Sequence, residues 1–390
     1  MASLDWIVIA LFVAAMVWII MSVVRKKKDN SSDYFLSGRD ATWIAIGASI
    51  FASNIGSEHL IGLAGSGASS GLAMAHWEIQ GWMILILAWV FVPFYERSMV
   101  YTMPEFLEKR YNRSSRKILT YISLISYVLT KVAVTVYAGG LVFQQVFGIE
   151  SINIFGASVD FFWVAAIGLV ILTAIYTVIG GMESVLKTSV LQTPILLLGS
   201  IVILILGFKE LGGWQNMLDL CNVTPAYEGA QGSMSHLMRP ISDPQYPWLG
   251  ALLGSAIIGF WYWCTDQFIV QRVLSGRDQK QARRGAIFGA YLKLLPVFLF
   301  LIPGMIAFAL ARGAATGALD TELGRQLAPV LTNGDVAFPL LVAKLLPAGF
   351  KGVVVCGILA ALMSSLATLR SSFLPANTHQ EGSGDTGSQH

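Results

Sequence analysis

The stretch GASIFASNIGSEHLIGLAGSGASSG, residues 47–71, decides the fold of this chain. It lies within a long apolar segment, yet it is rich in glycine and serine and contains Asn54, Glu58 and His59. Glycine weakens a helix, and an ionisable side chain at the bilayer centre costs about 2.5–3.5 kcal/mol on insertion scales. Irregular backbone at membrane depth persists only where protein or a water-filled cavity covers it. The stretch therefore predicts a broken transmembrane helix that lines a polar cavity.

An alternative interpretation of the same stretch is a stripe of small residues that lets two helices pack closely. That interpretation accounts for the glycines and serines. It does not account for Glu58 and His59, whose side chains are large, polar and expensive to bury. We therefore favour the broken helix.

The composition of the whole chain is that of a membrane protein. Of its 390 residues, 55% are hydrophobic and 13% charged, and the mean hydropathy is +0.64. A soluble domain carries about 25% charged residues, so this chain has too few charges to cover a surface in water. Its net charge of +3 is too small to indicate a nucleic-acid partner. The lipid bilayer is the predicted surrounding.

The sequence carries no enzyme signature that we recognise. The glycine-rich stretch lacks the Gly-Lys-Ser/Thr ending of a phosphate loop, and neither a G-x-S-x-G nor an H-E-x-x-H motif occurs. The three cysteines, Cys221, Cys264 and Cys356, form no C-x-x-C pair and predict neither a metal site nor a disulfide framework. We expect a protein that is not an enzyme and has no organic cofactor.

Nine apolar segments are long enough to span a bilayer. They are approximately residues 4–24, 42–71, 73–95, 117–146, 159–180, 188–208, 248–271, 285–311 and 350–368. The first is interpreted as a helix and not as a signal peptide, because its basic cluster follows the apolar run. Lysine and arginine gather in loops 25–41, 97–117 and 272–284, which predicts that these loops are cytoplasmic and the N-terminus external. The polar tail 369–390 is predicted to be disordered.

Six ionisable residues fall inside the predicted spans. They are Glu58, His59, Glu78, Lys131, Asp266 and Lys293. Taken singly, Lys131 could extend to the interface and Glu78 could lie at a helix start. Together they predict a polar cavity whose carboxylate, amide, imidazole and ammonium groups suit a neutral polyhydroxyl ligand. Aromatic side chains that can cover a sugar ring, or form an interfacial belt instead, are Trp77, Trp261, Tyr262 and Trp263.

Several longer motifs occur in order along the chain. They are residues 47–73, the runs FVPFYERSMVYTMPEFLEKRY (91–111), YTVIGG (176–181), WYWCTDQFIVQRVL (261–274), YLKLLP (291–296) and ALMSSLA (361–367). Over residues 34–368 the chain resembles the sodium:solute symporter family, and within it the sodium/glucose cotransporters. The resemblance implies an all-α polytopic membrane protein with the leucine-transporter-like fold of two five-helix inverted repeats.

The resemblance also implies a domain organisation. A symporter core would occupy residues 1–368, with the first repeat near 42–208 and part of the second near 248–368. After ALMSSLAT the chain reads LRSSFLPANTHQ, where the family continues with further helices. We therefore expect the second repeat to be incomplete and residues 369–390 to form a tail unlike the family.

The resemblance implies ligands for sodium and for a sugar. The sodium ligands would be backbone carbonyls of Ala52, Ile55 and Ala361 and hydroxyls of Ser364 and Ser365, although the residues alone favour helix packing for the two serines. The sugar ligands and gates are implied at matching positions. The implied sugar ligands are Asn54, His59, Glu78 and Lys293. Tyr262 would be the inner gate with Trp263 beside it, and Leu63 and Trp77 the outer gate. Glu58 and Gln267 would lie behind these residues and support them.

The implied function is sodium-coupled symport of a neutral, glucose- or galactose-like sugar across the plasma or inner membrane by alternating access. A cation that moves inward through 100 mV releases about 2.3 kcal/mol to drive such uptake. Rival interpretations are a truncated product that does not transport, and a sugar sensor or ion leak on the same fold. Ser189 stands where many sodium/sugar members carry an acid, which leaves the sodium stoichiometry open. The particular sugar and the oligomeric state also stay open.

Overall fold

A computed structural model describes residues 1–25, 40–56, 58–98, 103–154 and 156–373. Within these ranges, only the backbone is described for Val24, Lys131, Ile154, 176–183, Val185, Phe268, Ala361 and 364–373.

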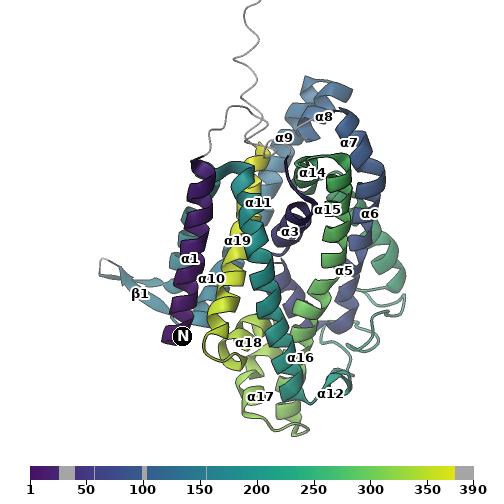
Figure 1. The fold of residues 1–390 in the computed structure, drawn as a ribbon. Helices are drawn as coiled ribbons and strands as arrows, with labels where there is room; N and C mark the ends of the chain where they lie inside the picture. Colours follow the sequence, from purple (N-terminus) through teal and green to yellow (C-terminus); the bar gives the residue numbers. More distant parts are fainter. Residues whose placement is uncertain (26–39, 57, 99–102, 155, 374–390) are drawn as a thin grey trace, which may run out of the picture.

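The described chain is a bundle of packed helices with one short β-hairpin at its edge (Figure 1). The hairpin pairs β1 (Ser151–Ile154) with β2 (Ala157–Asp160) in antiparallel register, with Ser151 opposite Asp160. The helices up to this hairpin are α1 (Ser3–Val24), α3 (Trp43–Asn54), α4 (Ala64–Ser69), α5 (His76–Ile79), α6 (Met83–Ile86), α7 (Val92–Ser98), α8 (Met103–Arg110), α9 (Arg113–Tyr127) and α10 (Ala133–Phe147). Those after it are α11 (Phe161–Leu211), α12 (Trp214–Leu220), α13 (Ser255–Cys264), α14 (Gln267–Leu274), α15 (Gln279–Leu292), α16 (Ile302–Thr316), α17 (Glu322–Gln326), α18 (Ala337–Leu345) and α19 (Phe350–Phe373).

Five described helices are long and apolar enough to cross a membrane. They are Ser3–Val23, Gly71–Ser98, Arg113–Phe147, Leu186–Leu211 and Gln279–Thr316. Four shorter apolar helices are Trp43–Asn54, Phe161–Ile175, Gly250–Cys264 and Phe350–Ala360. Each of the nine predicted segments overlaps one of these helices. These helices are assigned as able to span a membrane by their length and composition. The assignment agrees with the prediction that the chain lies in a lipid bilayer.

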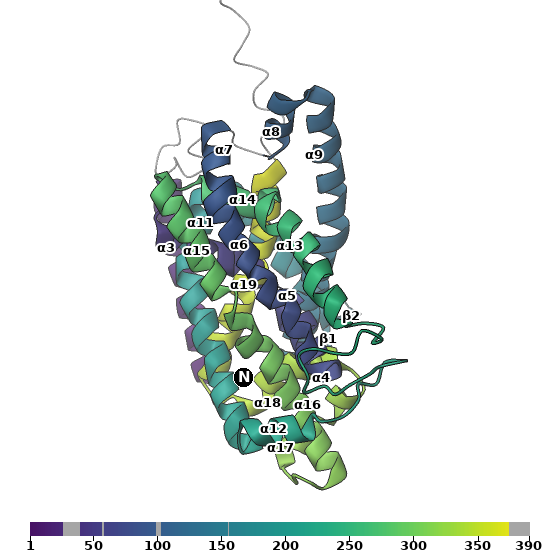
Figure 2. The same cartoon turned by 90° about the vertical axis from the view of Figure 1, so that its right-hand side faces the viewer.

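The outer helices expose apolar side chains, whereas the central ones bury them. On α1, Leu11 is 66% and Trp18 73% exposed, and such large apolar surface suits lipid contact. By contrast, Phe300, Met305 and Leu310 on the segment that includes α16 are fully buried. An apolar helix that is buried on all sides belongs to the centre of a bundle. Figure 2 shows α9 at the outer edge of the bundle.

The two predicted spans 159–180 and 188–208 form a single helical element, α11, of 51 residues. The expected loop between them is helical backbone instead. A straight helix of that length would measure about 77 Å at 1.5 Å per residue, far beyond the roughly 30 Å apolar core of a bilayer. The hairpin before α11 and α12 after it both lie in the lower half of Figure 1. The chain therefore reverses within α11, and its two halves can serve as two spans.

The predicted break in the second span is confirmed. Helix α3 ends at Asn54, and Ile55 adopts the extended conformation, with φ −76° and ψ 108°. Helical structure resumes as a π-helix at Glu58–Leu63 and continues as α4. Helix α4 packs so tightly against α16 that a Cβ added to Gly304 would overlap the Ala64 carbonyl oxygen. Small residues thus allow the broken helix to sit against the centre of the bundle.

A second break occurs where the sequence predicts an uninterrupted span, 248–271. Helix α13 ends at Cys264, Thr265 has φ −129° and ψ −15°, and α14 begins at Gln267. Threonine and aspartate are weak helix formers because their side chains compete for backbone hydrogen bonds. Here the Thr265 hydroxyl donates to the Trp261 carbonyl oxygen at 2.8 Å.

The C-terminal helix runs further than the sequence indicates. The disordered tail is predicted from residue 369, but α19 continues to Phe373. The sequence has no glycine or proline between Leu369 and Phe373, so nothing in it opposes another turn of helix. The rest of the predicted tail, 374–390, lies outside the described residues.

The long loop before α13 is folded around a buried arginine. Arg239 is 1% exposed and donates to the Tyr227 hydroxyl at 2.8 Å and to the Ser70 carbonyl oxygen. Burial raises the pKa of Asp243, but backbone N–H groups of Gln231 and Tyr246 and the Tyr227 hydroxyl lower it more, so the pKa lies below its usual value. The loop is thereby fixed against the end of α4.

Candidate functional site

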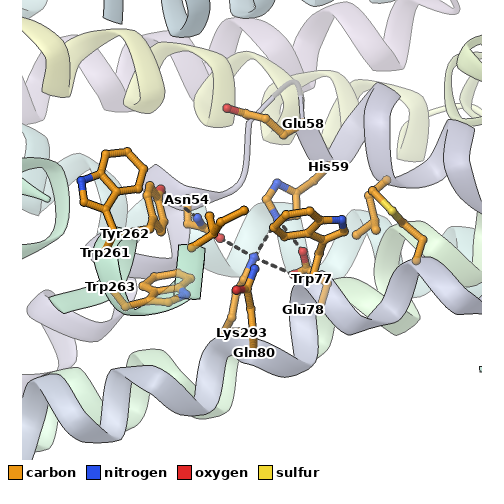
Figure 3. A pocket seen from close by; sticks show the side chains of 13 residues that line it. Asn54, Glu58, His59, Trp77, Glu78, Gln80, Trp261, Tyr262, Trp263 and Lys293 are labelled. Carbon is orange, nitrogen blue, oxygen red and sulfur yellow. Dashed lines mark hydrogen bonds and ion pairs between the residues drawn. The ribbon is translucent and has the colours of Figure 1, made fainter. Parts of the chain in front are cut away.

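A cavity of about 290 Å³ lies beside the break in the second span (Figure 3). Residues from the broken span, from the helix after it, from α13 and from the end of α15 meet there. The lining residues are Asn54, Glu58, His59, Leu63, Met74, Trp77, Glu78, Gln80, Ile258, Trp261, Tyr262, Trp263 and Lys293. All eight predicted sugar-ligand and gate residues are among them.

An ion pair between Glu78 and Lys293 forms the polar centre of the cavity. The Lys293 Nζ lies 2.7 Å from a Glu78 carboxylate oxygen, and the other carboxylate oxygen lies 3.3 Å from His59 Nε2. Glu78 is 4% and Lys293 5% exposed. Glu78 therefore lies inside the bundle and not on its surface. Each charge offsets the desolvation of the other, which is how buried charges persist.

Two further contacts link this pair to the helix break. Lys293 donates to Asn54 Oδ1 at 2.6 Å, and its Nζ lies 3.0 Å from His59 Nε2. Asn54 is the last residue of α3, and His59 belongs to the π-helix that follows the break. The break therefore turns polar side chains from both of its sides towards one lysine.

Aromatic rings form the other wall of the cavity. The Asn54 amide donates to the Tyr262 hydroxyl at 3.1 Å. The rings of Tyr262 and Trp263 meet nearly edge to face, with their centroids 4.9 Å apart. Lys293 Nζ lies 5.6 Å from the centre of the Trp263 ring, within cation–π range. Figure 3 shows these rings on the side of the cavity opposite Trp77.

Two buried polar atoms in the cavity wall lack a partner among the described residues. They are His59 Nδ1 and Gln80 Oε1. Buried polar groups are almost always hydrogen-bonded, so these two unpartnered atoms leave unused hydrogen-bonding capacity beside the cavity. The polar centre thus offers acceptors and donors side by side, which matches hydroxyl groups that both donate and accept.

Gln80, Met74 and Ile258 line the cavity although they are not among the residues predicted from the sequence. Gln80 follows Glu78 by two positions, and residues so spaced do not share a face of an α-helix. In the structure, the helix changes from α to 3₁₀ geometry at Gln80, which alters the direction of its side chain. Met74 and Ile258 are apolar residues in apolar segments, so nothing in the sequence distinguishes them from residues that do not line the cavity.

Other predicted residues lie elsewhere or outside the described residues. Gln267 does not line the cavity; its Oε1 accepts from the Met103 backbone N–H at 2.6 Å. Asp266 is buried at the second break. The side chain of Lys131 lies outside the described part.

The predicted sodium ligands fall at the break and on α19. Ala52 and Ile55 are buried at the end of α3, which packs against α19. Because Ile55 leaves the helical conformation, the helix cannot continue its hydrogen-bond ladder through this point. The side chains of Ala361, Ser364 and Ser365 lie outside the described residues, so the sodium site stays a prediction.

Known transporters share much of this sequence. The chain is 38% identical over 361 residues to sodium/myo-inositol cotransporter 2 of Mus musculus, with 90% of this chain and 52% of that protein covered. It is 36% identical over 374 residues to the sodium/myo-inositol cotransporter of Homo sapiens, with 89% and 50% covered. The chain thus spans about half the length of the curated relatives it matches.

A solved structure has the same fold. It is an outward-open, substrate-bound Na⁺-coupled sialic acid symporter, with a TM-score of 0.77 and 20% sequence identity, covering 99% of this chain and 77% of that one. This likeness confirms the predicted all-α, leucine-transporter-like fold class of a membrane protein.

The family itself is shown by sequence. A profile of the sodium:solute symporter family matches residues 34–378. The match agrees with the ordered motifs along the chain and confirms the prediction of a transporter family in place of an enzyme family. This chain belongs to the sodium:solute symporter family.

Proposed function

We propose that the protein couples the inward movement of sodium to the uptake of a neutral cyclic polyol of the myo-inositol type across the plasma membrane. The observation that carries this proposal is the cavity with an ion pair at its centre and aromatic rings on its wall. Glu78 and Lys293 cancel each other's charge, so the site has no surplus positive charge for an anionic solute. Family membership and the myo-inositol cotransporters among the relatives support the same class of substrate.

Coupling between the ion and the solute follows from the position of the break. Ile55, a proposed sodium ligand, is the first residue of the break, and Asn54, a proposed solute ligand, directly precedes it. An ion held there would fix the backbone that presents Asn54 to the solute. Such coupling is reciprocal and typically changes each affinity by about 5- to 150-fold.

The proposal is tested by equilibrium binding of labelled myo-inositol to the purified chain in lipid nanodiscs, and by uptake into cells that express the protein. We expect saturable binding that is stronger in sodium than in potassium, and sodium-dependent accumulation. Equal binding in both salts would contradict coupling. Solute-induced current without accumulation would indicate a sensor or leak.

Gly259→Ala should weaken solute binding about 5- to 10-fold while the fold is retained. A Cβ at position 259 would lie 2.5 Å from Gln80 Oε1, so the Gln80 amide must leave its present position in the cavity wall. Loss of one neutral hydrogen bond costs about 0.5–1.5 kcal/mol. Titration of the purified variant with myo-inositol measures the change. Gly254→Ala is the matched control, because no atom lies within 4 Å of its added Cβ.

Ser365→Ala should raise the sodium concentration for half-maximal binding about 5-fold or more, with a smaller effect at saturating sodium. The variant removes one proposed oxygen ligand, and small hard cations require several such oxygens. The measurement is myo-inositol binding at a series of sodium concentrations. An unchanged sodium titration would leave Ser365 as a helix-packing residue.

A further inference from the structure

A second pocket, of about 60 Å³, lies next to the solute cavity on the side of α8 and α14. Trp261 lines both cavities. The remaining lining residues of the second pocket are Met103, Pro104, Leu119, Thr120, Ser123, Tyr127, Thr265, Asp266 and Gln267. In Figure 1, α8 and α14 lie at the upper end of the molecule, and α8 falls within segment 97–117, which is predicted to be cytoplasmic. The pocket therefore lies between the solute cavity and the predicted cytoplasmic side.

Trp261, which lines both cavities, lies one turn before the break that separates α13 from α14. Among the contacts from neighbouring helices that hold this break are three short hydrogen bonds. The Tyr95 hydroxyl donates to the Cys264 carbonyl oxygen at 2.8 Å, and the Met103 N–H donates to Gln267 at 2.6 Å. The Tyr127 hydroxyl donates to Asp266 Oδ1 at 2.5 Å. Tyr95, Met103 and Tyr127 belong to three different helices.

The Tyr127–Asp266 contact differs from the other two. Both of its side chains line the second pocket, and both ends are side-chain atoms. A change of rotamer can break it without loss of backbone hydrogen bonds. Tyr127 ends α9, whose outer residues Tyr121 and Ile125 are 63% and 58% exposed, so this helix lies at the edge of the bundle. The contact thus joins a peripheral helix to the central break.

We infer that the Tyr127–Asp266 hydrogen bond is a latch that keeps the solute's inner exit closed. While it is made, the break supports Trp261 and Tyr262 beneath the solute cavity. When it opens, the break and α9 can separate, and the second pocket joins the solute cavity. A pocket of about 60 Å³ is too small for the occupant of a cavity of about 290 Å³, so exit requires this enlargement.

Asp266 has a further role once the latch is open. Asp266 is 4% exposed and lines the second pocket, which the leaving solute would enter. The oxygen that the Tyr127 hydroxyl releases can accept a hydrogen bond from a solute hydroxyl, and a hydrogen bond to a charged group contributes about 1.5–3 kcal/mol. The solute hydroxyl thus takes the place of the tyrosine hydroxyl. This inference rests on the proposed function, since it assumes a polyhydroxyl solute in the first cavity.

The test measures access to the second pocket from the predicted cytoplasmic side. Ser123→Cys places a thiol in the pocket wall, and inside-out vesicles are treated with a membrane-impermeant thiol reagent. Tyr127→Phe removes only the donating hydroxyl. We expect it to raise the labelling rate at position 123 about 10-fold or more, because a hydrogen bond to a charged group is lost. Sodium-dependent myo-inositol binding should change less than about 2-fold, since Tyr127 does not line the solute cavity.

Two further variants serve as controls. One tests whether loss of any tyrosine hydroxyl on this helix raises the labelling rate, and the other tests whether loss of the Asp266 charge does. Tyr121→Phe removes a hydroxyl from an exposed residue of the same helix and should leave the labelling rate unchanged. Asp266→Asn keeps an oxygen that can accept from Tyr127. Its labelling rate at position 123 should therefore stay closer to that of the unmodified protein than to that of Tyr127→Phe. Unchanged labelling in Tyr127→Phe would overturn the latch. Equal acceleration in Asp266→Asn would overturn it too, because the charge and not the bond would then be responsible. Absence of solute binding in every chain, with the labelling pattern intact, would refute the proposed function alone.

Discussion

Lys293→Met should abolish measurable myo-inositol binding and lower the free energy of unfolding by about 3–5 kcal/mol, the usual effect of removing one partner from a buried ion pair. The variant leaves the Glu78 carboxylate 4% exposed, with His59 as its remaining ionisable partner among the described residues. It also removes the donor to Asn54, which lies at the helix break. Denaturant or thermal unfolding in detergent measures the effect on stability, and titration with the solute measures the effect on binding.

The double variant Glu78→Gln with Lys293→Met separates the two effects. It removes both charges, and the replacement of a buried ion pair by neutral groups is often close to neutral for stability. We expect most of the stability to return, while solute binding stays lost because the polar centre is gone. Lys344→Met is the control, since Lys344 is exposed on α18. If Lys293→Met unfolds like the unmodified chain, Lys293 does not neutralise Glu78 in the folded protein.

The energetic expense of charge in lipid makes much of this site predictable from the sequence. His59, Glu78 and Lys293 stand out because they interrupt apolar segments, and the structure brings all three into contact. The same reasoning selects Asp266, which lies instead in the second pocket. The free-energy cost of an ionisable side chain in lipid indicates that the residue needs a partner. It does not indicate which residue that partner is.

Other features of the structure cannot be predicted from the periodicity or hydropathy of the sequence. Gln80 enters the cavity through a local change from α to 3₁₀ geometry, and such a change depends on packing against α13. Gly180 and Gly181 favour a turn and predict a loop, whereas the backbone at this reversal is helical within α11. Arg239 is buried although it lies in a polar loop, since it donates to Tyr227 of the same loop and to Ser70, which is distant in the sequence. For Arg239, tertiary contacts override the local preference for solvent.

Glu78→Gln should weaken myo-inositol binding about 10-fold or more, the equivalent of about 1.4 kcal/mol. Gln has the shape of Glu but lacks its charge, and a hydrogen bond to a charged group contributes about 1.5–3 kcal/mol. The effect on stability should be smaller than that of Lys293→Met. Lys293 keeps Asn54 at 2.6 Å and His59 at 3.0 Å as neighbours, so its ammonium group is not left alone.

A deoxy solute can show whether Glu78 accepts a hydrogen bond directly from the solute. If it does, the unmodified chain should bind the myo-inositol analogue that lacks that hydroxyl about 10-fold more weakly, whereas Glu78→Gln should discriminate little between the two solutes. Such non-additivity is the signature of a direct contact. Glu322→Gln, at an exposed residue that pairs with Arg325 on the surface, should leave both affinities unchanged. The alternative result is that Glu78→Gln discriminates against every monodeoxy analogue as strongly as the unmodified chain does. In that case the carboxylate acts on the solute only through Lys293 and His59, and the solute's hydroxyls are bound by the other residues of the cavity.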